Sequence, residues 1–211
     1  MSRMRRSLVK LGVLLGVTTL SACGGAPSPP PLLSLDGRSC AAEPDLARAL
    51  LLTLEPVKPV AVVLGANTAC WEPVGGPKAI YAAFQLPEAS HEYLITGESA
   101  PAGLGLFSPR LVVLDAAGQP LREIPRDSFQ FHSALLSAGV RAHQGERYLI
   151  VASDPSAIGK SESRIASSSS VSTTCVRTGC INIYAGHEAT TTLVYAYNGS
   201  ITVTARPLPS N

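Results

Sequence analysis

Five cysteines are the residues whose type and spacing most directly predict chemistry in this chain. Cys23 closes the segment Leu20 to Cys23, which matches the lipobox of bacterial lipoproteins: small residues admit a peptidase, and the thiol takes a diacylglycerol with acyl chains such as palmitate. Before it stand the basic residues of 3–10 and the apolar stretch 11–20, the order found in a secretory signal. We therefore expect cleavage before Cys23 and a lipid-anchored mature chain.

Residues 1–24 allow other interpretations, which differ in the export route and in the membrane that holds the chain. An apolar stretch of about ten residues falls short of the roughly 20 that a transmembrane helix needs. The segment Arg5 to Lys10 also resembles a twin-arginine export motif, which would imply folding before export. Gly24, rather than Asp, follows the cysteine, which favours the outer membrane over retention at the inner one. The expected address is the periplasm, with the lipid holding the chain to the outer membrane.

Four cysteines remain: Cys40, Cys70, Cys175 and Cys180. An even number in an oxidising compartment predicts disulfides, and three pairings are possible. Cys40–Cys70 with Cys175–Cys180 is favoured because each pair closes a local loop. A zinc site is the rival interpretation, but no Cys-x-x-Cys is present and the four histidines are scattered singly.

The charge balance gives no sign of a nucleic-acid partner. The whole chain carries 17 Lys and Arg against 15 Asp and Glu. Removing residues 1–22 takes four of the bases and none of the acids, so the mature balance is 13 − 15 = −2. Since no stripe of Lys and Arg is left to neutralise phosphates, binding to DNA or RNA is not expected.

The motifs of common enzymes are incomplete here. The segment 154–161 ends in Gly-Lys-Ser but has Asp154 where a phosphate-binding loop needs its first glycine. The segment 97–101 lacks the second glycine of a serine-hydrolase elbow. Glu88, His91 and Glu92 suggest an acid–base cluster, yet neighbours on a strand point to opposite faces. The sequence therefore predicts no catalytic residue, no cofactor and no metal, although a hydrolase with an unrecognised site stays an alternative.

Aromatic residues offer one binding hypothesis. Trp71 and Tyr81 lie close in sequence, and exported β-proteins stack sugars on aromatic faces. Trp71 also follows Cys70 directly, and packing over a disulfide is the favoured explanation for it. We keep Trp71 and Tyr81 as candidate ligand-binding residues.

The periodicity of apolar residues predicts a mainly β fold. A short helix is expected over Asp45 to Leu54, since Leu46, Leu50 and Leu54 repeat at helical spacing. Beyond it the pattern is that of strands, with Tyr148 to Ala152 as a central one. The other expected strands are Val60 to Leu64, Ile80 to Leu86, Glu92 to Thr96, Leu111 to Leu114 and a pair of alternating positions, Phe129 and Phe131.

The end of the chain is expected to form a hairpin after a loop. Asn198-Gly199 between Thr192 to Tyr197 and Ser200 to Ala205 is typical of a two-residue turn. The serine-rich segment 161–174 reads as a loop. The predicted organisation is a signal peptide (1–22), a flexible spacer (23–35) and one antiparallel β-sandwich, jelly-roll-like, over 36–211.

The strand-and-turn patterns of Ala79 to Pro87, Phe107 to Asp115, Phe129 to Phe131 and Arg147 to Ala152 resemble the maltose-operon periplasmic protein family (MalM-like). The resemblance covers about residues 76–161 and implies a β-rich exported domain that supports carbohydrate uptake. It carries over no catalytic residue. The serine-rich segment, Cys175 and Cys180, and the C-terminal hairpin depart from the family and put a maltose-specific role in doubt.

Two functions from different classes follow. The first is a non-enzymatic lipoprotein that supports carbohydrate transport or binding of the maltose or maltodextrin type. The second is a structural accessory lipoprotein of a secretion, pilus or envelope assembly, whose sheet edge pairs with a partner strand.

Overall fold

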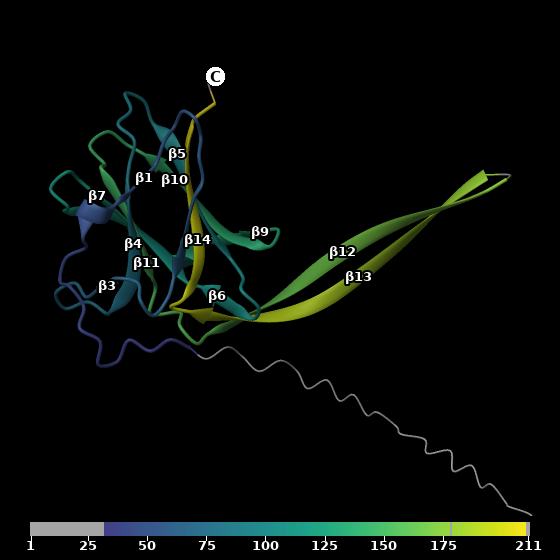
Figure 1. Cartoon of the computed structure of the whole chain (residues 1–211), viewed down its shortest axis with the longest axis horizontal. Helices are drawn as coiled ribbons and strands as arrows, with labels where there is room; N and C mark the ends of the chain where they lie inside the picture. Colours follow the sequence, from purple (N-terminus) through teal and green to yellow (C-terminus); the bar gives the residue numbers. More distant parts are fainter. Residues whose placement is uncertain (1–31, 178, 210–211) are drawn as a thin grey trace, which may run out of the picture.

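The computed structural model describes residues 32–177 and 179–209, and Figure 1 shows a compact β-rich body from which one long hairpin projects. The expected mainly β class is confirmed: the strands form three sheets, and no α-helix of seven or more residues occurs in this part of the chain. None of its helical segments is both long enough and apolar enough to cross a bilayer.

The first sheet has β11 (Tyr148–Ser153) at its centre, as its continuous apolar sequence predicts. The pairing is antiparallel except between β1 and β4. The strand order is β1 (Leu50–Leu51), β4 (Ala79–Gln85), β11, β7 (Pro109–Leu114) and β8 (Pro120–Ile124), with β3 (Cys70–Trp71) paired to β4.

The second sheet is antiparallel throughout. Its strand β5 alternates buried and half-buried residues, because one face meets the core and the other meets solvent. The strand order is β2 (Val60–Leu64), β14 (Gly199–Pro207), β5 (Tyr93–Ala100), β10 (Leu135–Ala142) and β9 (Gln130–His132).

Both sheets supply side chains to the main hydrophobic core. Phe84 and Leu149 of the first sheet and Ile95 and Ile201 of the second are fully buried in one cluster. A smaller cluster lies on the other face of the first sheet, where Leu46 packs against buried side chains of β4, β7 and β11. The first sheet is therefore covered on both faces, which explains why β4 and β11 lack strand-like alternation.

The third sheet consists of β12 (Ser161–Val176), β13 (Gly179–Ala196) and β6 (Gly105–Phe107). We call residues 163–192 of β12 and β13 the arm, and the other described residues the body. In Figure 1 the arm extends far beyond the body. The expected loop over 161–174 is therefore wrong: an uninterrupted antiparallel ladder with β13 pairs one side of this backbone.

The helix expected over Asp45 to Leu54 is also wrong. Only a 3-10 turn, η1 (Leu46–Arg48), forms there, capped by the Asp45 carboxylate. Leu50 and Leu51 instead pair with the free edge of β4. A strand edge offered by distant residues outweighs the weak local preference for a helix. The other short turn is η2 (Arg126–Ser128).

The C-terminal hairpin around Asn198-Gly199 does not form. β13 pairs with β12 and β6, whereas β14 pairs with β2 and β5, so the two residues carry the chain from one sheet to another. A Cβ at Gly199 would lie 2.8 Å from the Cβ of Phe107. Glycine is thus needed for close packing and not for a two-residue turn.

The expected spacer ends earlier than residue 35. Leu35 is buried in the main core and Leu33 packs against it. Apolar side chains at both positions tie this segment to the body. The rest of the expected spacer, Cys23 and the signal peptide lie outside the described residues.

Candidate functional site

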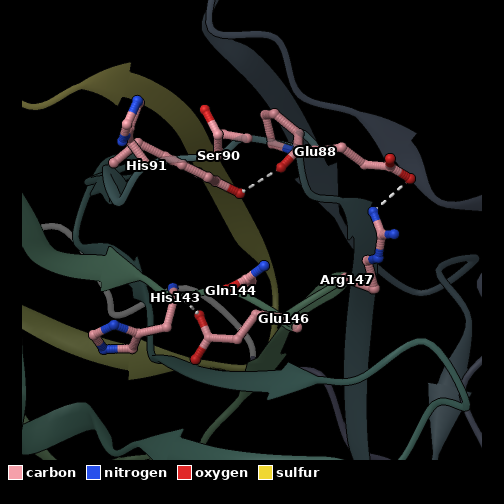
Figure 2. Close-up of a pocket in the computed structure, with 11 residues that line it drawn as sticks. Glu88, Ser90, His91, His143, Gln144, Glu146 and Arg147 are labelled. Carbon is pink, nitrogen blue, oxygen red and sulfur yellow. Dashed lines mark hydrogen bonds and ion pairs between the residues drawn. The ribbon is translucent and has the colours of Figure 1, made fainter.

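A polar cavity of about 510 Å³ lies where the loop between β4 and β5 faces the loop between β10 and β11. Figure 2 shows side chains from the two loops on opposite sides of it. The lining residues are Pro87, Glu88, Ala89, Ser90, His91, Tyr93, His143, Gln144, Gly145, Glu146 and Arg147.

The buried carboxylate of Glu146 anchors the loop between β10 and β11, which we call the lower loop. Arg122 donates to it from Nε at 2.7 Å and from Nη2 at 2.9 Å, and the backbone N–H of His143 donates to Oε2 at 2.9 Å. Gly145, at φ +92°, allows the tight turn that brings Glu146 back to His143. The charge of Glu146 is therefore fully compensated by a bidentate guanidinium.

The loop between β4 and β5, which we call the upper loop, is held by a second ion pair and by the buried side chain of Tyr93. Arg147 Nη1 lies 2.5 Å from Glu88 Oε1, the contact drawn in Figure 2. The hydroxyl of Tyr93 donates to the carbonyl oxygen of Pro87 at 3.1 Å. Burial, and secondarily the charge of Glu146, raises the pKa of Tyr93 to about 12 against an opposing effect of Arg147. Tyr93 is thus a neutral hydrogen-bond donor at physiological pH.

A third carboxylate, Glu92, is occupied outside the cavity. His143 Nδ1 lies 2.9 Å from Glu92 Oε1, and Arg141 Nη1 lies 3.3 Å from Oε2. The hydrogen bond from His143, and then the charge of Arg141, lowers the pKa of Glu92. Glu88 and His91 line the cavity, whereas Glu92 does not. All three residues line a neighbouring cavity of about 410 Å³, and His91 and Glu92 precede β5, so the expected alternation along a strand does not apply to them.

The cavity presents polar side chains that are free to bind a ligand. Among the described residues, the side chains of Ser90, His91 and Gln144 line it without a hydrogen bond to another part of the protein. In the same part of the chain no group of three or more His, Cys, Asp or Glu side chains is placed to hold a metal ion. The arrangement offers free polar groups beside carboxylates that are paired with arginines, which suits a ligand rich in hydroxyl groups.

Trp71 and Tyr81, the aromatic residues singled out from the sequence, are packed into the smaller cluster. The indole N–H of Trp71 donates to the carbonyl of Ala42 at 3.0 Å, and the Tyr81 hydroxyl accepts from the N–H of Asp45 at 2.7 Å. Arg110 lies 5.7 Å from the ring centroid of Trp71. Trp71 retains only an edge on a separate cavity of about 220 Å³, so both residues hold the N-terminal segment to the body.

The disulfides have the favoured pairing. Cys40–Cys70 joins the N-terminal segment to β3, and Cys175–Cys180 joins β12 to β13 near the end of the arm. With all four thiols used, the zinc alternative loses its ligands.

The arm carries exposed apolar side chains near its end. Five of them lie within 171–184, which we call the tip, and each is between 56% and 75% exposed: Val171, Val176, Ile181, Ile183 and Tyr184. Between Arg164 and His187, Arg177 is the only charged residue. Clustered exposed apolar residues of this kind mark interaction surfaces.

The register of β12 with β13 decides on which face of the ribbon each side chain of the tip lies. Val171 and Tyr184 are ladder partners and share one face with Thr173 and Asn182. Ile181 and Ile183 project from the other face. The tip is therefore apolar on both sides of the ribbon.

Two arginines hold the base of the arm: Arg126 contacts the residues of β12 and β13 next to the arm, and Arg164 of the arm contacts the body. Arg126 Nη2 lies 2.7 Å from Glu162 Oε2 and its guanidinium lies 4.4 Å from the ring centroid of Tyr195. Arg164 of the arm lies 3.8 Å from the ring centroid of Phe131 and donates to the carbonyl of Ser133. These contacts hold the arm at a defined angle to the body.

No family model, curated protein or solved structure matches this chain. The resemblance to the maltose-operon periplasmic family therefore stays a prediction. Its strand patterns lie on β4, β7, β9 and β11, all of them in the body.

Sequence reasoning missed both features that could bind a ligand or partner. The lower wall of the cavity depends on Arg122, whose contact with Glu146 joins residues far apart in the sequence. The arm had a local signal: Val171, Thr173 and Thr174 on one side of the turn and the run 190–192 of threonine on the other are β-branched. Its serine content was taken as a sign of a loop.

Proposed function

We propose that this chain is a non-enzymatic accessory lipoprotein of the bacterial envelope that docks on a protein partner through the tip of its arm. In this proposal the chain is exported, cleaved before Cys23 and held to the outer membrane by lipid. The two larger sheets form an antiparallel, jelly-roll-like β-sandwich, an arrangement supported by their shared core. The observation that carries the proposal is the exposed apolar tip at the end of a polar, anchored arm.

The arm gains stability when a partner covers its tip. An isolated two-stranded ribbon is marginally stable in water. The tip exposes Ile181 and Tyr184, on opposite faces, with Arg177 as the only nearby charge. Burying such side chains contributes about 1.5–3 kcal/mol each relative to exposure. A partner with an apolar cleft therefore gains affinity from both faces at once.

A protein is favoured over a lipid surface because of the backbone. The outer edge of β13 near the tip carries N–H and C=O groups that other described strands do not pair. Hydrocarbon cannot satisfy such groups, whereas a protein surface can. This argues for a proteinaceous cleft as the occupant.

Site-specific photo-crosslinking in intact cells tests the proposal. A photoreactive residue at Ile183 is expected to give one discrete adduct with an envelope protein, and the same residue at Val74 is the control. Val74 is 98% exposed but lies on the body. The double variant Ile181→Ser/Tyr184→Ser is expected to abolish the adduct from Ile183 while the melting temperature is kept.

Two outcomes would overturn this function. Identical adducts from Ile183 and Val74 would show that the tip has no special partner. Flotation of the purified chain with phospholipid vesicles, lost in the double variant, would make a lipid surface the occupant. The anchoring part is tested separately, by mass spectrometry of the N-terminal peptide for a diacylglyceryl group on Cys23.

A second candidate function is the binding of a neutral carbohydrate in the polar cavity, favoured by its compensated charges. Glu88, Glu92 and Glu146 are each paired with an arginine, while Ser90 and Gln144 remain free to bind hydroxyl groups. The resemblance to the maltose-operon periplasmic family points the same way.

Calorimetric titration with maltodextrins tests this candidate. Trp71 does not line the cavity, so its fluorescence is a poor readout. Gln144→Ala is expected to weaken binding about tenfold, in line with the loss of a good hydrogen bond. Gln119→Ala, beside the separate Trp71 cavity, is the matched control. Absence of heat across a glycan panel contradicts the candidate.

A further inference from the structure

The outer edge of β12 is an unprotected strand edge. In the third sheet the order is β12, β13, β6, so β12 pairs with β13 along one side from Ser161 to Val176. No other described strand pairs with its second side. A long row of backbone N–H and C=O groups is thus open to a further strand.

The devices that normally block such an edge are missing. Proteins protect edge strands with lysines, prolines, bulges or short strand length. Between Arg164 and Arg177 the sequence has neither a charge nor a proline. The ladder with β13 runs in unbroken register over the 16 residues of β12. The edge is therefore long and regular, and it carries no charged residue over 165–176.

We infer that a second copy of this chain occupies the edge, with β12 pairing antiparallel to β12 about a two-fold axis. An edge offered by two identical copies is self-complementary under such an axis. A register centred on Ser170 places Arg164 of one copy opposite Val176 of the other, so like charges do not face each other.

The shape of the molecule permits this pairing. The arm projects from one end of the body in Figure 1, so two antiparallel arms direct their bodies to opposite ends. The product is a four-stranded ribbon in which each arm is paired along one more edge. Three or more strands are what an exposed ribbon needs for stability.

The geometry of the tip identifies which backbone groups face the open edge. Opposite residues of an antiparallel ladder alternate between hydrogen-bonded pairs, with Cα atoms about 5.5 Å apart, and non-hydrogen-bonded pairs, at about 4.5 Å. The Cα atoms of Cys175 and Cys180 are 4.0 Å apart, as in a non-hydrogen-bonded pair. The N–H of Thr173, two residues earlier, therefore points to the open edge of β12, and that of its ladder partner Asn182 points to the far edge of β13.

This alternation gives a matched pair of variants. Thr173→Pro removes an N–H from the β12 edge and Asn182→Pro removes one from the β13 edge, and neither removes a β12–β13 backbone bond. Both lose the same side-chain hydrogen bond, from Thr173 Oγ1 to Asn182 Oδ1 at 2.8 Å. A difference in self-association between the two variants therefore reports the part that the outer edge of β12 plays.

Sedimentation equilibrium of the full chain in density-matched detergent measures the association. We expect a dimer whose dissociation constant rises about tenfold or more in Thr173→Pro and changes less than about twofold in Asn182→Pro. A chain that stays monomeric at about 100 µM would overturn the inference. Equal effects of the two prolines would also overturn it.

A charge pair tests the register without proline. Ser170→Lys and Ser170→Glu each place like charges opposite one another on the two-fold axis, so each alone is expected to be monomeric. An equimolar mixture is expected to dimerise again. Failure of the mixture to recover would overturn the proposed axis.

These tests are separable from that of the docking function. The proline and charge variants leave Ile181, Ile183 and Tyr184 in place, whereas Ile181→Ser/Tyr184→Ser leaves the β12 edge intact. A monomeric chain that still gives the Ile183 adduct would refute the dimer and keep the function. A chain that dimerises but gives no adduct from Ile183 would keep the dimer and refute the docking function.

Discussion

The body and the arm are made from similar strands but stabilised in different ways. In the body, β4 and β11 are buried on both faces and their side chains enter two hydrophobic clusters. In the arm, β12 and β13 are longer than any body strand, yet the side chains of the tip are exposed. Strand length thus depends on ladder pairing, whereas stability of the fold depends on burial.

The difference has a functional meaning. A region that contributes little to its own folding is free to present apolar side chains to a partner. The body supplies what the arm lacks, which is a fixed base formed by Arg126 and Arg164. The comparison therefore predicts that variants in the two regions separate stability from binding.

The largest effect is expected from an aromatic core residue. Phe84→Ala removes a fully buried ring from the main core and should lower the free energy of unfolding by about 3–5 kcal/mol. Tyr184→Ala removes a ring that is 75% exposed at the tip and should change it by less than about 0.5 kcal/mol. Denaturant unfolding measures both; similar losses would show that the arm is part of the cooperative core.

Loss of the disulfide in the body should destabilise the fold more than loss of the disulfide in the arm. Cys40 and Cys70 are 30 residues apart, and the chain-entropy estimate for such a loop is about 3.5 kcal/mol. Replacing both by serine should destabilise the body by roughly that amount. Cys175→Ser/Cys180→Ser opens a loop of only five residues at the far end of the arm and should leave the main thermal transition in place. A shared loss in both double variants would contradict the separation.

The base of the arm should give an intermediate effect. Arg126→Ala removes the ion pair with Glu162 and the contact with Tyr195, and is expected to cost about 1–2 kcal/mol. Hydrogen exchange should rise at the base of β12 and β13 and stay unchanged in β11. Asp127→Asn is the control, because Asp127 is 97% exposed and lies 3.9 Å from Arg126.

The smallest effect concerns the rim of the cavity and pH. The pKa of Glu92 is lowered in the fold by the hydrogen bond from His143 and the charge of Arg141. The ionised carboxylate therefore adds stability above its unfolded pKa near 4.5, and this contribution is lost as the pH falls through the lower folded value. Glu92→Gln should reduce the drop in melting temperature between neutral and acid pH. His143→Ala should do the same, and an unchanged acid profile in both would refute the coupling.

Sequence patterns located most of the body but little of the candidate sites. Val60 to Leu64 and Tyr148 to Ala152 were predicted because continuous or β-branched apolar runs have few alternatives to a buried strand. The strands β8 and β10 were not predicted, since Arg122, Gly139 and Arg141 interrupt their apolar pattern. The cavity depends on Glu146 meeting Arg122 across two strands, a contact that local spacing does not encode.

The errors share a cause. Asn198-Gly199 has the composition of a hairpin turn, and Asp45 to Leu54 has the spacing of a helix, but in each case backbone pairing with distant strands determined the outcome. Trp71 and Tyr81 were taken as candidate binding residues because a sequence does not show which aromatic faces are covered.

By itself the sequence determined the β-rich class, the favoured disulfide pairing and the expectation of export and lipid attachment. These depend on residue type and short spacing, which are read directly along the chain. Tertiary structure alone decided that 161–174 is half of a projecting arm and that three carboxylates around the polar cavity are neutralised by arginines. Both depend on pairing between residues far apart in the chain, and such pairing is fixed only when the whole backbone finds its hydrogen-bond partners.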